Sequence, residues 1–301
     1  MSLVATLICN PASPSLDSTL LDAARAILPG AEAAEWLFEG IAADIPFSPA
    51  GEDSKDGQRA IAARLREAAG DLPVDIVVQP VLGRRKRLFL ADMDSTMIGQ
   101  ECIDELADFA GLKAHVAAIT ERAMRGEIEF APALRERVAL LKGLPVGVVD
   151  EVIEKRITLT PGGIELVRTM RANGAYTCLV SGGFTLFTGP IAGKIGFQEN
   201  RANRLLVEDG KFTGRVAEPI LGKEAKLDTL VDLTESFELD TIESLVAGDG
   251  ANDIPMIQAA GLGVAYHAKP VVAAVAAARV DHGDLTALLY MQGYRRDEFV
   301  E

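Results

Sequence analysis

Four short apolar runs constrain the fold of this chain more than any other feature of its sequence. None of them alternates apolar with polar residues, and uninterrupted runs of this kind are typical of parallel strands covered by helices on both faces. Segments with helical spacing of apolar residues separate the runs, which are RLFLA (87–91), YTCLVS (176–181), SLVAG (244–248) and GLGVAY (261–266). This order predicts an α/β fold with a doubly wound, mostly parallel sheet.

Two insertions are expected within this plan. The residues between the first and second runs have mostly helical patterns, with no strand pattern among them. They predict an all-α lobe over approximately residues 100–160, inserted after the first strand of the sheet. Later in the chain, Asp209-Gly210 lies between two extended runs and predicts a tight hairpin.

Residues 1–82 are predicted to form a small α+β domain, and residues 83–301 the larger α/β domain. The first segment has a βαββαβ pattern, which fits a ferredoxin-like sandwich. Its expected elements are a strand at 3–9, a helix at 20–28, extended pieces at 34–38 and 41–47, a helix at 57–70 and a strand at 74–82.

The overall charge limits the choice of partners. The formal net charge is −14, which argues against nucleic acid, because binding to phosphate backbones requires a basic face. The basic run Arg84–Arg87 is therefore interpreted as a solvated linker before a strand. No apolar run is long enough to span a bilayer, so we expect no membrane partner and a cytoplasmic localisation. Cys9, Cys102 and Cys178 lie in apolar surroundings and are expected to be reduced and buried.

Polar residues follow three of the predicted strands at the point where each strand ends. Asp92 and Asp94 follow the first strand, Ser181-Gly182-Gly183 the second, and the segment 248–253 (GDGAND) the third. Lys226 lies between the second and the third. Because the carboxyl ends of parallel strands meet at one edge of a sheet, we expect these groups to share one site.

The chemistry of this set is that of phosphoryl transfer. Clustered carboxylates repel one another unless a cation intervenes, and carboxylate oxygens are ligands that Mg²⁺ prefers. Lys226, Ser181 and glycine-rich backbone amides supply donors for phosphate oxygens. One carboxylate of the Asp92–Asp94 pair can act as a nucleophile, and the other can transfer the proton of the leaving group and then of water.

These motifs resemble the phosphoserine phosphatases of the haloacid dehalogenase-like superfamily. The resemblance runs from about residue 85 to residue 301. It includes DMDSTMIGQECIDELADFAG, ITERAMRGEIEF, LRERVALLKGLP, LVSGGF, KEAK and VAGDGANDIPMIQAAGLGVAYHAKP. The resemblance implies a Rossmann-like core with the helical lobe as a cap, and hydrolysis of O-phospho-L-serine as the last step of serine biosynthesis. Many relatives carry an ACT-type module at the N-terminus, so an ACT-like fold is expected for residues 1–82.

The resemblance also implies a role for individual residues. Asp92 is the nucleophile that forms an aspartyl-phosphate, and Asp94 is the general acid and base. Mg²⁺ is held by Asp92, Asp249 and the main-chain carbonyl of Asp94, with support from Asp253. The phosphoryl group is bound by Ser181, Gly182, Lys226 and Asn252. The amino acid part of the substrate meets Glu101, Arg137, Met124 and Phe130, of which the last two line the lid.

Several alternatives remain open at this point. A phosphotransferase of the same fold would pass the phosphoryl group to an alcohol such as homoserine instead of water. A non-catalytic amino acid sensor would use residues 1–82 as its functional part. A serine hydrolase based on Ser181 lacks the G-x-S-x-G elbow and a suitable histidine. The oligomeric state is also open, with a homodimer as one option.

Overall fold

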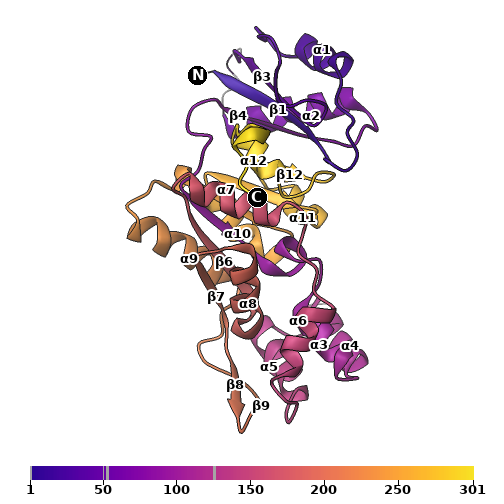
Figure 1. Ribbon diagram of the computed structural model, residues 1–301, viewed down its shortest axis with the longest axis vertical. Coiled ribbons are helices and arrows are strands. Elements are labelled where there is room, and N and C mark those ends of the chain that lie inside the picture. The colour runs from indigo at the N-terminus through magenta and orange to yellow at the C-terminus, as the bar shows by residue number, and fades with distance from the viewer. Residues whose placement is uncertain (1, 50, 52–53, 125–126) are drawn as a thin grey trace.

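The chain folds into an antiparallel sheet, a parallel sheet and a helical lobe, which follow one another along the long axis of the molecule (Figure 1). The computed structural model describes residues 2–49, 51, 54–124 and 127–301. Within this part of the chain, no helix is both long and apolar enough to cross a membrane.

The N-terminal unit has the predicted βαββαβ order. Its four strands form an antiparallel sheet in the order β2-β3-β1-β4, which is the ferredoxin-like arrangement. Every residue of the central strand β1 is buried. The elements are β1 (Leu3–Cys9), α1 (Ser18–Ile27), β2 (Glu35–Phe38), β3 (Ala42–Phe47), α2 (Lys55–Ala69) and β4 (Val74–Pro80). Division of the chain into domains at residues 82 and 83 stays a prediction.

The parallel sheet contains six strands in the order β12-β11-β10-β5-β6-β7. The four predicted strands are its centre, and two strands that the apolar pattern did not predict, β7 and β12, are its edges. The bounds are β5 (Leu88–Ala91), β6 (Tyr176–Phe184), β7 (Glu199–Asn203), β10 (Ser244–Gly248), β11 (Leu262–Tyr266) and β12 (Ala278–Val280).

Helices cover both faces of this sheet, as expected for a doubly wound fold. In β5, Leu88 and Leu90 pack in one apolar cluster with residues of α9, α10 and α11, whereas Phe89 and Ala91 pack in a second cluster with residues of α7, α8 and α12. All four residues are fully buried, which explains the uninterrupted apolar run. The helices are α7 (Gly163–Ala172), α8 (Thr185–Ile195), α9 (Lys223–Ser236), α10 (Ile254–Ala259), α11 (Pro270–Ala273) and α12 (Ala287–Met291).

The two predicted insertions are both present. The lobe consists of α3 (Cys102–Phe109), α4 (Lys113–Met124), α5 (Phe130–Leu140) and α6 (Val148–Lys155). The hairpin of β8 (Leu205–Glu208) and β9 (Lys211–Val216) turns at Asp209-Gly210, where both residues have positive φ. Backbone hydrogen bonds join Phe212 of the hairpin to Gly143 and Leu144, so the hairpin supports the lobe.

The linker between the two sheets contradicts one expectation. The run Arg84–Arg87 was predicted to be solvated, but this is wrong for Arg84 and Lys86, whose side chains are mostly buried. Arg84 forms an ion pair with Asp44 at 2.7 Å, and Lys86 donates to main-chain carbonyls. These partners replace water, because the N-terminal unit packs directly on the parallel sheet. The three cysteines are buried and free, as predicted.

Candidate active site

The carboxyl ends of β5, β6 and β10 line a cavity of about 160 Å³. Side chains from α3 and α5 of the helical lobe complete the walls. The lining residues are Asp92, Asp94, Glu101, Ile103, Phe130, Leu134, Arg137, Ser181, Gly182, Gly183, Phe184, Asp249, Gly250, Asn252 and Lys269. Nine of the predicted site residues are among them. Lys226 and Asp253 are instead buried behind Asp92.

Asp92 is fixed at the end of β5 by bonds on both sides. Its N–H donates to the carbonyl of Ala247 in β10 at 3.0 Å, and its Oδ1 accepts the N–H of Met93 at 2.8 Å. The chain then turns sharply, with Ser95 at a φ of +55°. The Asp92 side chain is buried, and its carboxylate faces the cavity at the carboxyl edge of the sheet. A short strand followed at once by a turn therefore holds this carboxylate in one position.

Asp94 lies beside Asp92 but has different contacts. Its Oδ1 accepts the N–H of Cys102 at the start of α3, at 3.4 Å. Burial and the negative charge of Glu101 raise the pKa of Asp94 to about 7. A carboxyl group with this pKa exchanges protons readily near neutral pH, which is the property that a general acid and base requires.

Lys226 joins two carboxylates beneath the cavity. Its Nζ lies 2.7 Å from Oδ1 of Asp92 and 2.6 Å from Oδ1 of Asp253. Burial lowers the pKa of Lys226, but the charges of Asp92 and Asp253 outweigh this effect and hold the pKa above its usual value. Lys226 is therefore a permanent positive charge at the base of the site.

Three carboxylates converge on one point. Carboxylate oxygens of Asp92, Asp249 and Asp253 lie within 4.8 Å of one another. Burial and the charge of Asp253 raise the pKa of Asp249 to about 6, and burial raises that of Asp92 well above its usual range. Lys226 alone does not neutralise this group, and Asp249 reaches the cavity. An all-oxygen, acidic set of this kind fits a hard divalent cation such as Mg²⁺.

The structure brings together the carboxylates of some of the predicted metal ligands but not of all of them. Asp92 and Asp249 belong to the converging group, and so does Asp253, which the sequence assigned a supporting role. The carboxylate of Asp94 is not part of that group. Its predicted contribution is a main-chain carbonyl, and that contribution stays a prediction.

The loop after β6 provides polar groups beside Asp94. Ser181 Oγ accepts the N–H of Gly183 at 2.9 Å. A Cβ atom added to Gly183 would lie 3.0 Å from Ser181 Oγ and 3.4 Å from Oδ2 of Asp94, so the backbone approaches the carboxylate closely because this residue is glycine. Asn252 also lines the cavity. The arrangement leaves small, polar groups around the space next to Asp92 and Asp94.

Two contributing residues were missed by the sequence analysis. Asn203, buried at the end of β7, donates to the carbonyls of Gly182 and Leu221 and accepts the N–H of Leu221, so it joins the loop after β6 to the segment before Lys226. Lys269 lines the cavity, and its N–H donates to the carbonyl of Asp249. The available signals were the polar end of β7 and a lysine three residues beyond β11.

The lobe and the segment before it supply further residues of the cavity wall. Arg137 is half-buried, and its only bond among the described residues runs from Nε to the carbonyl of Ala133, at 3.3 Å. Glu101 accepts the hydroxyl of Ser95 at 2.8 Å. The ring of Phe130 lies against Gly182, since a Cβ atom there would be 3.4 Å from Phe130 Cζ. Met124 ends α4, but its side chain lies outside the described residues.

Sequence comparison gives the family. The profile of the haloacid dehalogenase-like hydrolases matches residues 89–258. The phosphoserine phosphatase of a Polaromonas species is 46% identical over 208 residues, which are 67% of this chain and 88% of that protein. The chain belongs to the haloacid dehalogenase-like hydrolase family. The predicted resemblance to phosphoserine phosphatases and the assignment to enzymes are thereby confirmed.

Solved structures of this family share the fold. A HAD family hydrolase from Salmonella enterica serovar Typhi superposes over 99% of both chains, with a TM-score of 0.85 and 28% identity. A phosphoserine phosphatase in a phospho-aspartyl intermediate analogue state covers 68% of this chain and 98% of its own, with a TM-score of 0.63 and 39% identity. The first likeness includes the N-terminal unit, so this hydrolase shares its whole architecture with a solved relative.

Proposed function

We propose that this hydrolase releases phosphate from O-phospho-L-serine in a Mg²⁺-dependent reaction through an aspartyl-phosphate on Asp92. One observation carries the proposal: Asp92 and Asp94 line the same cavity as Arg137 and Glu101. The two aspartates suit chemistry on a phosphoryl group, and the other two side chains suit an amino acid. The names of the relatives agree with this substrate and intermediate. In the cell, the reaction would be the last step of serine biosynthesis.

The acidic group of Asp92, Asp249 and Asp253 supports the Mg²⁺ requirement. Asp92 and Asp249 would hold the ion, with the main-chain carbonyl of Asp94, and Asp253 would support them. When bound, the ion would reduce the repulsion between the negatively charged carboxylates and the negatively charged phosphate. Lys226 already neutralises part of that charge from below, so the nucleophile and the anionic substrate can approach each other.

The first chemical step forms a bond between Asp92 and phosphorus. An Asp92 carboxylate oxygen attacks, the bond from phosphorus to the serine oxygen breaks, and the leaving alkoxide takes the proton of Asp94. A protonated Asp94 is available near neutral pH because its pKa is raised to about 7. Ser181 and the amides near Gly182 would hold phosphoryl oxygens during this step.

The second step reverses the role of Asp94. Its carboxylate, now without the proton, takes one from water, and the hydroxide formed attacks phosphorus. The bond to Asp92 breaks and inorganic phosphate leaves, so both aspartates return to their starting state. One residue can serve both proton transfers because it lies next to the nucleophile and is not itself one of the three converging carboxylates.

The lobe would select the amino acid part of the substrate. The Arg137 guanidinium offers a planar pair of donors to a carboxylate, and the Glu101 carboxylate pairs with an ammonium group. The cavity of about 160 Å³ supports a small substrate, such as an amino acid phosphate, over larger phosphomonoesters. Phe130, packed against Gly182, would shield the reacting centre from water.

A panel of phosphomonoesters tests this proposal. With Mg²⁺ present, phosphoserine is expected to give the highest kcat/KM, above phosphothreonine, phosphoethanolamine and sugar phosphates, and EDTA is expected to abolish phosphate release. Equal rates for phosphoserine and sugar phosphates would contradict the substrate. Formation of phosphohomoserine from added homoserine would instead identify a phosphotransferase. A failure to hydrolyse any of the esters would favour a non-catalytic sensor. Cytoplasmic localisation, the ACT-like fold of residues 1–82 and a homodimer stay predictions.

A further inference from the structure

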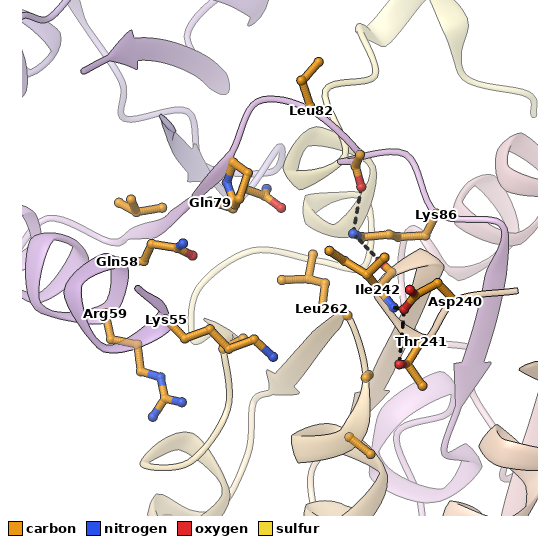
Figure 2. Close-up of a pocket in the computed structure, with 17 residues that line it drawn as sticks. Lys55, Gln58, Arg59, Gln79, Leu82, Lys86, Asp240, Thr241, Ile242 and Leu262 are labelled. Atoms are coloured by element: carbon orange, nitrogen blue, oxygen red, sulfur yellow. Dashed lines mark hydrogen bonds between the residues drawn. The ribbon is translucent and has the colours of Figure 1, made fainter. Parts of the chain in front are cut away.

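A second cavity lies at the amino ends of the parallel strands, on the edge of the sheet opposite to Asp92. Its volume is about 370 Å³, and it is formed by α2 and β4 of the N-terminal unit, the linker after β4, and the segments that precede β10 and β11 (Figure 2). None of its lining residues belongs to the active-site cavity. The reaction proposed above assigns it no task.

The walls of this cavity are largely apolar and partly uncovered. Val78, Pro80 and Leu262 line it, together with Ile242 and Leu82, whose side chains are 61% and 81% exposed. Exposed aliphatic side chains gathered around one cavity favour contact with an apolar group. The volume lies in the range of small-molecule sites and far exceeds the size of a simple inorganic anion.

A buried lysine faces this apolar surface without an acidic partner. The Lys86 side chain is 7% exposed, and Nζ donates to the carbonyls of Gly83 and Ile242, each at 2.8 Å. No carboxylate of the described residues lies within ion-pair distance of Nζ. An ammonium group has three donors, so one remains for a further acceptor.

Further positive charge comes from the opposite wall. In Figure 2, Lys55 extends from α2 on one side and Lys86 from the linker on the other, with Ile242 and Leu262 between them in this view. Burial lowers the pKa of Lys86 to about 8, the charge of Glu243 opposes this effect, and the charge of Lys55 adds to it. The two ammonium groups thus repel each other, and an anion between them would relieve the repulsion.

Among the described residues, Asp240 is the acidic residue that lines the same cavity. Asp240 Oδ1 accepts the N–H of Ile242 at 3.0 Å and lies 3.4 Å from the hydroxyl oxygen of Thr241. This carboxylate therefore caps the turn before β10. In the view of Figure 2, Asp240 lies on the side of Lys86 and away from Lys55, so its charge favours the Lys55 side of the cavity for an anion.

We propose that this cavity binds a small organic dicarboxylate. One carboxylate accepts the remaining Lys86 proton, the other pairs with Lys55, and the carbon chain lies on Ile242 and Leu262. Arg59, which also lines the cavity, adds positive charge to the Lys55 side. The ligand would then bridge the N-terminal unit and the parallel sheet, at the amino ends of the strands that carry Asp92 and Asp249.

Binding of glutarate to the full-length chain tests the proposal. Titration calorimetry without Mg²⁺ is expected to show saturable binding of one glutarate per chain. Lys55→Glu is expected to weaken binding at least about tenfold, because it places a negative charge opposite one carboxylate. Lys86→Met is expected to abolish binding. Lys55 is exposed, so the first variant keeps the test valid if the second fails to fold.

Two controls separate this cavity from the rest of the surface. Lys194→Gln removes an exposed lysine of α8, away from the cavity, and is expected to leave the affinity unchanged. Arg137→Gln alters the active-site cavity and is also expected to leave the affinity for glutarate unchanged. A loss of glutarate binding in Arg137→Gln, or unchanged binding in Lys55→Glu, would overturn the proposed site. Butyrate binding as tightly as glutarate would overturn the dicarboxylate class.

Discussion

Two buried lysines lie at opposite ends of the same parallel sheet and have opposite surroundings. Lys226, at the carboxyl edge, has carboxylate oxygens of Asp92 and Asp253 at 2.7 and 2.6 Å. Lys86, at the amino edge, has two neutral carbonyls at 2.8 Å. The pKa of Lys226 is held above its usual value, whereas that of Lys86 is lowered to about 8.

This difference shows that partners, rather than burial, decide what a buried charge can do. Lys226 is paired with two carboxylates of the protein and offsets part of their negative charge beside the space proposed for a metal ion and a phosphoryl group. Lys86 has only neutral carbonyl partners among the described residues, so its charge is left for an anion from outside. We therefore expect the carboxyl edge to respond to cations and phosphate esters, and the amino edge to organic anions.

The largest expected effect concerns the nucleophile at the carboxyl edge. Asp92→Asn keeps the shape of the side chain but removes its negative charge, so no aspartyl-phosphate forms. We expect kcat for phosphoserine to fall at least about 1000-fold, measured as phosphate release with Mg²⁺. Asp150→Asn, which changes an exposed aspartate of α6, serves as the control and is expected to keep full activity. An active Asp92→Asn enzyme would show that another group attacks phosphorus.

The two lysines are expected to differ in their contribution to stability. Lys226→Met leaves the buried Asp92 and Asp253 without their cationic partner and is expected to lower the free energy of unfolding by about 3 kcal/mol. Lys86→Met loses bonds to neutral carbonyls only and is expected to cost about 1 kcal/mol. Urea unfolding in EDTA measures both, with Lys223→Met, an exposed lysine of α9, as the matched control. Equal losses at the two positions would remove the basis of the comparison.

Arg137 is expected to act on substrate binding more than on the chemical step. Arg137→Gln removes the charge that meets the substrate carboxylate, so KM for phosphoserine is expected to rise about 10- to 100-fold, with a smaller change in kcat. Arg135→Gln is the matched control, because Arg135 is exposed on the same helix and pairs with Glu218 outside the cavity. A loss confined to kcat would place Arg137 in the chemical step instead.

The carboxyl edge is also expected to make stability depend on pH when no metal is bound. The pKa values of Asp94 and Asp249 are raised to about 7 and about 6, whereas aspartate in an unfolded chain has a pKa of about 3.9. The folded chain therefore holds protons that the unfolded chain has released. This stabilisation is complete below about pH 4 and is lost as pH rises through about 6 to 7.

Urea midpoints in EDTA at about pH 5.5 and about pH 7.5 measure this loss of stability. Asp249→Asn is expected to reduce the difference between the two midpoints, and saturating Mg²⁺ to raise the midpoint most at the higher pH. The same pH dependence in Asp249→Asn and in the unmodified chain would exclude this carboxyl group as one of its causes.

The smallest expected effect concerns Lys86 at the amino edge. It occurs at alkaline pH, and there stability rises with pH instead of falling. The pKa of Lys86 is lowered to about 8, below the value of about 10.4 for an unfolded chain. Between these values the unfolded chain binds more protons, so the stability contribution of Lys86 rises with pH. The slope of stability against pH in this range is expected to be smaller in Lys86→Met. Lys226→Met is expected to leave that slope unchanged. A changed slope in Lys226→Met would contradict the attribution of the pH dependence to Lys86.

The sequence predicted the centre of the fold better than its edges. The strands β5, β10 and β11 are covered on both faces, so their burial left an uninterrupted apolar run. The edge strand β7 has the sequence ENRAN and is mostly half-exposed, and β12 has only three residues. Neither leaves an apolar run long enough to be recognised, because an edge strand buries less of its surface.

The same reasoning applies to individual site residues. Asp92, Asp94 and Ser181 could be placed together because each follows an apolar run, and the ends of parallel strands meet. Asn203 could not be found, since its bonds to Gly182 and Leu221 depend on the position of an edge strand. The burial of Lys86 depends on a segment about 150 residues away in the sequence, in which the carbonyl of Ile242 accepts its Nζ donor. The local charge pattern around Lys86 does not reveal this contact.

Covalent trapping on Asp92 tests the central claim most directly. The enzyme is mixed with phosphoserine and Mg²⁺, quenched with acid during turnover, digested and examined by mass spectrometry. We predict that the peptide containing Asp92 gains the mass of one phosphoryl group and that Asp92→Asn shows none. Phosphate release without any phosphorylated Asp92, or with the phosphoryl group on another residue, would contradict the proposed reaction.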